Sequence, residues 1–154
     1  MRLTRFTDYS LRVLMYAGLA RDRLVTIAEL AEVYDISSNH LMKVVHFLSQ
    51  HQYLATQRGK GGGMRLARDP ADINIGELVR LTETNDVLVE CFDRAHSQCR
   101  IGAVCRLKGV LHAAQEAFYA ELGKHTLAEL LAEPAPLAQV FGIDADAIGR
   151  ANRA

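Results

Sequence analysis

A chain of 154 residues with 49% hydrophobic and 23% charged side chains has the composition of a globular protein with one core. It contains no apolar run of about 18 residues, and its start lacks the apolar segment of a secretory signal, so we expect a cytoplasmic protein with no membrane partner. The net charge is zero, but residues 1–68 hold ten Lys and Arg against five Asp and Glu, and residues 69–154 hold eight against thirteen. A basic half is typical of proteins that bind nucleic acid, although ordinary variation in surface charge gives similar numbers.

Helical periodicity predicts the first elements of the chain. Apolar residues at helical spacing predict a helix over residues 4–20, begun by Thr4 or Thr7. Thr26 followed three residues later by Glu29 is a capping box, which predicts a second helix over residues 26–34. A tight turn at residues 35–36 leads to a third helix, capped by Ser37 and running to about residue 51. Two short helices joined by such a turn are typical of a helix-turn-helix.

Two short strand candidates follow, at residues 53–57 and 64–67, with a glycine-rich basic segment over residues 58–63 between them. Four glycines in five residues disfavour a helix or a strand interior and favour a hairpin tip. A helix-turn-helix followed by a basic hairpin is a winged helix. A phosphate-binding nucleotide loop is excluded by spacing, because the lysine precedes the glycines and no Ser or Thr follows it. A further helix is expected from Asn74 to about residue 81.

The second half of the chain contains a long predicted helix. It follows a domain whose core is already complete, so its apolar side needs another packing partner. Residues 84–103 read as irregular, residues 104–122 as a long helix with one apolar stripe, and residues 126–132 as a short helix. A second copy of the chain is the expected partner of the stripe, and packing within one subunit is the alternative. The fold is therefore mainly α, a winged helix-turn-helix with a long C-terminal dimerisation helix. We expect a DNA-binding domain (1–82), a loop (83–103), a dimerisation region (104–133) and an unassigned tail (134–154).

The solvent side of the third helix and the hairpin supply the candidate DNA contacts. Polar groups opposite the apolar stripe suit base edges in the major groove, and the hydroxyls at the start of the helix suit a phosphate. The basic residues of the hairpin suit phosphates or the minor groove. A solvated polar face is the alternative interpretation. The predicted DNA-binding residues are Ser37, Ser38, Asn39, His40, Lys43, His46, Gln50, Arg58, Lys60 and Arg65.

Three cysteines, Cys91, Cys99 and Cys105, lie close together in the sequence. A disulfide framework is disfavoured in the cytosol, whereas clustered thiols there often bind metal. Their spacing matches neither zinc ribbons nor bacterial ferredoxins, so unligated thiols remain an alternative. A zinc site completed by His96 or His112 is another. A thiol redox enzyme is disfavoured because the chain has no C-x-x-C pair, and we expect no enzymatic activity.

The chain resembles the NsrR/IscR family of iron–sulfur winged-helix repressors from residue 1 to about residue 133. The resemblance rests on the opening segment 3–12, on Ser38-Asn39-His40-Leu41, on the 58–63 hairpin and on the three cysteines. It implies a homodimer on a palindromic operator, with an iron–sulfur cluster held by Cys91, Cys99 and Cys105 and by Asp8 from the partner subunit. Without the family, Asp8 would be an ordinary acidic residue in the first turn of a helix.

The resemblance also favours one branch of the family, the nitric-oxide sensors. One relative uses a histidine three residues after its third cysteine, where this chain has Lys108, which cannot ligate while protonated. Membership of this branch implies a 4Fe–4S rather than a 2Fe–2S cluster. It also implies that the repressor leaves its operator when nitric oxide reacts with the cluster. Alternatives are a regulator that senses iron supply or redox state, or a zinc-binding structural DNA-binding protein. The interval from Cys91 to Cys99 is longer than the family pattern, which puts the shape of the loop in question.

Overall fold

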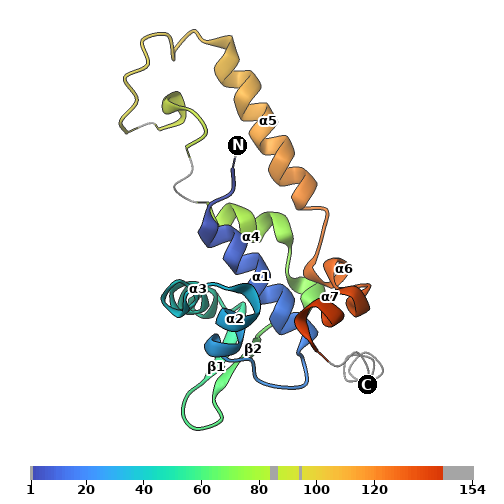
Figure 1. Cartoon of the computed structure of the whole chain (residues 1–154). Coiled ribbons are helices and arrows are strands. Elements are labelled where there is room, and N and C mark those ends of the chain that lie inside the picture. The colour runs from blue at the N-terminus through green and yellow to red at the C-terminus, as the bar shows by residue number, and fades with distance from the viewer. Residues whose placement is uncertain (1, 84–86, 94, 144–154) are drawn as a thin grey trace.

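The computed structural model describes residues 2–83, 87–93 and 95–143 (Figure 1). The described part is mainly helical, and its one sheet is the antiparallel pair β1–β2, in which Leu54 lies opposite Leu66. The elements in order are α1 (Arg5–Leu19), α2 (Ile27–Tyr34), α3 (Ser38–Gln50), β1 (Leu54–Gln57), β2 (Gly63–Leu66), α4 (Ile75–Thr82), α5 (Arg106–Leu122), α6 (Leu127–Leu130) and α7 (Pro134–Phe141). Two single 3-10 turns, η1 (Pro70–Asp72) and η2 (Glu90–Phe92), complete them. The predicted winged helix-turn-helix is therefore confirmed.

Side-chain caps begin most of the helices. Thr4, rather than Thr7, caps α1 by accepting a hydrogen bond from the backbone N–H of Thr7. Thr26 and Glu29 form the complete capping box at the start of α2. Asn74 caps α4 and Thr126 caps α6 in the same way. Each cap satisfies a backbone donor that the first turn of a helix leaves free, which is why these boundaries could be predicted.

Three expectations differ from the structure. Ser37 is the N-cap residue of α3, but its hydroxyl makes no capping hydrogen bond and lies 3.1 Å from Nδ1 of His40. The long helix begins at Arg106 rather than at residue 104, with Cys105 as its N-cap residue. Part of the unassigned tail is helix α7, which starts with a proline in its first turn, a position where the missing N–H costs nothing. Residues 144–154 of the predicted tail lie outside the described residues.

The core lies around α1, which contacts α3, β2, α4 and α6. Its central side chains are apolar and almost completely buried: Val13, Leu14, Leu30, Leu41, Leu48, Met64, Leu78 and Val79. Backbone hydrogen bonds of 2.8 Å in both directions between Val25 and Met64 attach the α1–α2 loop to the wing. The helix-turn-helix and the wing are thus held on one rigid support.

The C-terminal helices return to this core. Leu127 and Leu131 of the α6 region are buried against Gly18 of α1, where an added Cβ would collide with the Leu131 side chain. Phe141 of α7 packs against the rings of Tyr16 and Tyr34, with 5.3 Å between centroids in both pairs. The chain beyond α5 therefore packs back against α1 and α2.

Helix α5 extends away from this body, and residues 87–93 and 95–105 lie at its far end, opposite the wing (Figure 1). Its C-terminal end is anchored on α4, where Arg80 pairs with Glu116 and lies over the ring of Tyr119, 4.2 Å from its centroid. Leu107 and Val110 nearer its start are 59% and 64% exposed. The first half of the apolar stripe of this helix is therefore uncovered in the single chain, whereas Phe118 and Leu122 pack partly against the core. None of the helices in the described part of the chain has the length and hydropathy that a membrane crossing needs.

We expect Gly76→Ala to lower the free energy of unfolding by about 1–3 kcal/mol, the usual cost of overpacking. A Cβ at position 76 would lie 2.5 Å from the backbone nitrogen of Gly123 and 2.7 Å from the carbonyl oxygen of Tyr119. Because these are backbone atoms, α4 and the end of α5 must separate. Urea denaturation measures the change. The control Glu77→Ala, on the exposed side of α4, should change the free energy by less than about 0.5 kcal/mol. Wild-type stability in Gly76→Ala would contradict the close helix contact.

Candidate functional site

Helix α3 has one buried face and one exposed face. The buried residues are Leu41, Val44, Val45 and Leu48. The exposed side carries the polar residues that the sequence predicts to contact DNA: Ser37, Ser38, Asn39, His40, Lys43, His46 and Gln50. The structure therefore brings these donors and acceptors together on one open helix surface, as a major-groove contact requires.

The wing is a short hairpin whose tip is shaped by glycine. Gly59 and Gly61 have φ of 101° and 76°, values that L side chains rarely adopt, and a Cβ on Gly62 would collide with the carbonyl oxygen of Gln57. Arg58 and Lys60 stand exposed at this tip, and Arg65 is exposed on β2. The glycines thus give a narrow turn whose side chains are mainly basic.

Two of the three cysteines converge on a glycine. A Cβ at Gly102 would lie 3.9 Å from Cβ of Cys99 and 4.0 Å from Cβ of Cys91. The backbone N–H of Gly102 donates to the carbonyl of Cys99 at 3.1 Å, which closes a tight turn there. All three cysteines are free, half-buried thiols. Cys105 is the N-cap residue of α5, where the free N–H groups of a helix favour negative charge.

The two histidines considered as zinc ligands differ in their surroundings. His112 lines a pocket of about 260 Å³ together with Cys91, Phe92, Lys108 and Gln115, and its ring centroid is 6.0 Å from that of Phe92. His96 instead lies 3.0 Å from the carboxylate of Asp93, and this hydrogen bond lowers the pKa of Asp93. His112, on α5, is therefore a neighbour of Cys91.

Asp8 lies in the first turn of α1, where it pairs with Arg12 at 2.9 Å. Arg12 lies 5.8 Å from the ring centroid of Tyr34, and the Tyr34 hydroxyl donates to the backbone carbonyl of Arg12 at 3.0 Å. Burial raises the pKa of Tyr34, so this hydroxyl stays a donor at neutral pH. Among the described residues of one protomer, no three His, Cys, Asp or Glu side chains come together as a metal site. The four-residue ligand set Cys91, Cys99, Cys105 and Asp8 remains a prediction.

Comparison with known proteins identifies the family to which this chain belongs. The model of the Rrf2 family, described as iron-dependent transcriptional regulators, matches residues 3–133. The chain belongs to the Rrf2 family. It is 52% identical to the HTH-type transcriptional regulator NsrR of Bacillus subtilis over 132 residues, which cover 85% of this chain and 90% of that protein. It is 44% identical to NsrR of Oceanobacillus iheyensis over 145 residues, covering 94% and 99%.

Solved structures agree with this Rrf2 fold. IscR of T. potens superposes with a TM-score of 0.66 at 21% identity, and the match covers 88% of this chain and 90% of that one. CymR, the global cysteine regulator of B. subtilis, has a TM-score of 0.66 at 17% identity and covers 86% and 97%. The fold is thus that of Rrf2 proteins, and because the NsrR relatives and the family model describe transcriptional regulators, the prediction of a regulator rather than an enzyme is confirmed.

A polar junction between α1 and α4 was not predicted from the sequence. Oε1 of Glu83 accepts hydrogen bonds from the backbone N–H of Thr4 at 2.7 Å and from its hydroxyl at 3.0 Å. The hydroxyl of Thr7 donates to that of Thr82 at 2.9 Å. Glu83 is only 6% exposed, and its Oε2 has no partner among the described residues. The junction fixes the first turn of α1, which carries Asp8, to the end of α4 in this Rrf2 protein.

Met42 was also missed, because it lies outside the apolar stripe of α3. It is 48% exposed on the same side of the helix as Asn39, Lys43 and His46. An apolar side chain placed in solvent within a polar helix face is the signal that could have identified it.

We expect Glu83→Ala to lower the free energy of unfolding by about 1–3 kcal/mol, because two hydrogen bonds to a charged acceptor are lost. Glu83→Gln keeps one oxygen acceptor and should lie between the alanine variant and the wild type. Thermal and urea denaturation of the metal-free protein measure both variants. Glu32→Ala, an exposed residue of α2, is the control. If Glu83→Ala and Glu32→Ala have the same stability, the junction contributes nothing.

Proposed function

We propose that this regulator is a homodimeric repressor that holds an iron–sulfur cluster on Cys91, Cys99 and Cys105 and releases its operator in response to nitric oxide. The observation that carries the proposal is the convergence of Cys91 and Cys99 on Gly102, at the loop that leads to Cys105. The 52% identity to NsrR of Bacillus subtilis supports it. In this proposal residues 1–82 bind DNA, residues 83–103 form the cluster-binding loop, residues 104–133 form the dimerisation region, and residues 134–154 are the C-terminal tail.

The donor set fits the cluster, because thiolates are the ligands that iron–sulfur clusters take. The missing side chain of Gly102 leaves space between Cys91 and Cys99 that a larger residue would fill. Asp8 of a second subunit would supply the fourth ligand, and this set favours a 4Fe–4S over a 2Fe–2S cluster. When bound, the cluster supplies the iron with which nitric oxide reacts.

Dimerisation through α5 is supported by its uncovered apolar side chains. Leu107 and Val110 are 59% and 64% exposed, and Val104 just before the helix is 83% exposed. Surfaces of this kind are uncommon on proteins that stay monomeric. A two-fold pair would place two α3 helices about 34 Å apart, one turn of DNA, and so match a palindromic operator.

The residues of α1 connect ligation to DNA contact. A carboxylate is a poorer ligand for iron–sulfur centres than a thiolate, so Asp8 would be the weakest of the four ligands. Arg12 pairs with Asp8 at 2.9 Å. Phe6, two residues earlier, packs edge-on against Phe47 of α3 with 5.1 Å between ring centroids. A movement of this turn therefore reaches α3 directly. A coupling of about 3 kcal/mol would change operator affinity about a hundredfold.

A zinc site is the second candidate function, and the position of His112 beside Cys91 favours it. Zinc bound by three thiolates and an imidazole would give a colourless protein with a structural metal. Anaerobic purification distinguishes the two, because an iron–sulfur protein absorbs visible light. Release of the operator by iron chelation rather than by nitric oxide would instead indicate a sensor of iron supply or redox state.

We expect Asp8→Ala to alter the anaerobic visible spectrum and to reduce the nitric-oxide-dependent change in operator affinity at least about tenfold. The reason is the loss of the carboxylate that joins the cluster of one subunit to α1 of the other. Absorbance and gel-shift titrations with nitric oxide measure both effects. Arg12→Ala is the matched control, since it removes the same ion pair and leaves the carboxylate. An unchanged spectrum and response in Asp8→Ala would refute the role of Asp8.

We expect Asn39→Ala and Lys60→Ala to weaken DNA binding in different ways. Asn39→Ala should weaken the free energy of operator binding by about 1–3 kcal/mol, because the Asn39 amide would hydrogen-bond base edges. Its binding to random DNA should stay the same. Loss of the wing lysine should weaken operator and random DNA equally. Fluorescence anisotropy with both duplexes measures the ratio. A uniform effect of Asn39→Ala would place α3 outside the major groove.

A further inference from the structure

Met42 is an exposed apolar side chain in a domain that otherwise keeps its large apolar side chains covered. Among residues 2–83, all of which the structure describes, it is the only large hydrophobic residue that is exposed, with 48% of its surface accessible. The other exposed large apolar residues of the described chain lie between residues 87 and 110 or in α6 and α7. Isolated apolar residues are common on protein surfaces, so the position of Met42 decides whether it has a role.

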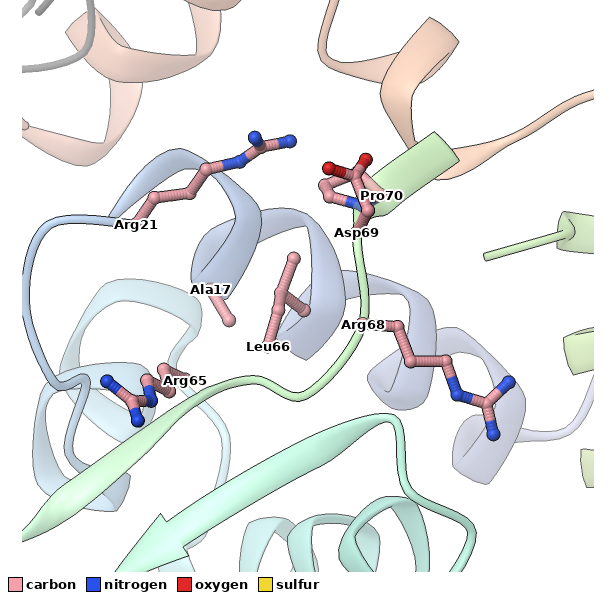
Figure 2. Close-up of a pocket in the computed structure, with 7 residues that line it drawn as sticks. All are labelled: Ala17, Arg21, Arg65, Leu66, Arg68, Asp69 and Pro70. Carbon is pink, nitrogen blue, oxygen red and sulfur yellow. The ribbon is translucent and has the colours of Figure 1, made fainter. Parts of the chain in front are cut away.

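Even at the base of the wing, the apolar side chain points into the protein. Figure 2 shows Leu66 of β2 beside Ala17 of α1, and the guanidinium group of Arg65 directed away from both. A Cβ on Gly18 would lie 3.6 Å from a methyl carbon of Leu66, so this leucine packs on α1. The strand alternates between core and solvent, as strands at a surface do. Met42 is the exception to this arrangement in the domain.

Met42 lies within the candidate DNA surface of α3. Residues three and four apart are neighbours on a helix face, so Met42 lies between Asn39 and His46 in one row, and Lys43 follows it in the chain. Asn39, Lys43 and His46 are all exposed polar residues. The buried residues of α3 hold its other side against the core, so this row points away from the protein. An apolar group thus stands among the side chains that are proposed to contact bases.

The major groove of DNA contains one kind of group that matches an apolar side chain. Thymine presents a methyl group at C5, whereas the other base edges in this groove present mainly hydrogen-bond donors and acceptors. Burying those polar atoms under a methionine would cost free energy, because their hydrogen bonds to water would be lost without replacement. A flexible, unbranched thioether can follow the surface of a methyl group closely. The chemistry of the groove therefore selects thymine as the partner of Met42.

The spacing of the row fits the spacing of base pairs. Asn39 and Met42 are three residues apart, which is about 4.5 Å along a helix axis. Successive base pairs are about 3.4 Å apart along B-DNA. With α3 lying along the groove, the two side chains therefore reach neighbouring base pairs.

We propose that Met42 contacts the C5 methyl group of one thymine in each operator half-site, in the base pair next to the one that Asn39 contacts. This inference rests on the proposed function, because it requires α3 to lie in the major groove. Met42 is then a specificity-determining residue, which favours a T·A pair over a C·G pair at this position. The contact adds an apolar selection to the hydrogen bonds of the neighbouring polar residues.

The test removes the methyl group from the DNA and the apolar side chain from the protein. An operator is first selected from random DNA with the anaerobically purified wild type. Each of its thymines is then replaced in turn by deoxyuridine, which keeps the base pair and lacks only the C5 methyl group. The protein variants are Met42→Ala, Met42→Leu and the control Val140→Ala, which shortens an exposed apolar residue of α7. Fluorescence anisotropy titrations give the affinity of each protein for each duplex.

We expect one thymine per half-site at which deoxyuridine weakens binding of the wild type and of Val140→Ala about fourfold, the factor for exposing one methyl group to water. Met42→Ala should bind the unmodified operator more weakly and lose the sensitivity to deoxyuridine at this position. Met42→Leu should keep it, because leucine offers an apolar surface of similar size. The effects of the two deletions should not add, since both remove the same contact.

The proposal is overturned if no thymine is sensitive in the wild type, or if Met42→Ala keeps the sensitivity. It is also overturned if Met42→Ala weakens binding to the operator and to random DNA equally, because a methyl contact is specific to one base. Conversion of the dimer to monomers by Met42→Ala, measured by sedimentation without DNA, would show that a second chain covers this side chain instead. The proposed function is tested separately by the preference of the wild type for the operator over random DNA.

Discussion

The burial of α1 is the interaction on which the rest of the structure depends. This helix contacts α3, β2, α4 and α6, and its residues Val13 and Leu14 are completely buried. Its first turn carries Asp8 and is held by Glu83, while its end leads to the loop that is attached to the wing. Asp8, the proposed sensing residue, and the proposed DNA-binding elements α3 and the wing are therefore all held by α1. Because packed interiors resist small displacements, α1 keeps them in fixed relative positions.

The sequence predicted the N-terminal domain well because its signals are local. Capping residues and apolar periodicity specify α1, α2, α3 and α4 within a few neighbouring residues, and glycine specifies the wing tip. Helix α7 could not be predicted in this way. Two prolines precede its apolar residues, and its stability comes from Phe141 packing on Tyr16 and Tyr34, which are distant in the sequence. Tertiary contact of this kind leaves little trace in a local pattern.

The candidate site has two parts, the exposed face of α3 and the cysteine loop, and the sequence predicted the first better than the second. The exposed face of α3 follows from helical geometry alone, so Asn39, Lys43 and His46 lie where the sequence placed them. The cysteines lie in a loop, and spacing could not show that Cys91 and Cys99 meet at Gly102. The Glu83–Thr4 contact joins residues that are 79 positions apart, and no local signal marks it. The assignment of Asp8 depends on the family resemblance, because a ligand supplied by a second subunit has no signature within one chain.

The uncovered stripe of α5 has a consequence for how such a regulator responds to its own abundance. If pairing through Leu107 and Val110 is needed before two α3 helices can read one operator, promoter occupancy depends on the square of the protomer concentration at low copy number. Small changes in synthesis or degradation then produce steep changes in transcription. An unpaired chain would also leave this apolar surface open to proteases and chaperones, which bind exposed apolar surface. The same helix face can thus set both the threshold of repression and the lifetime of the protein.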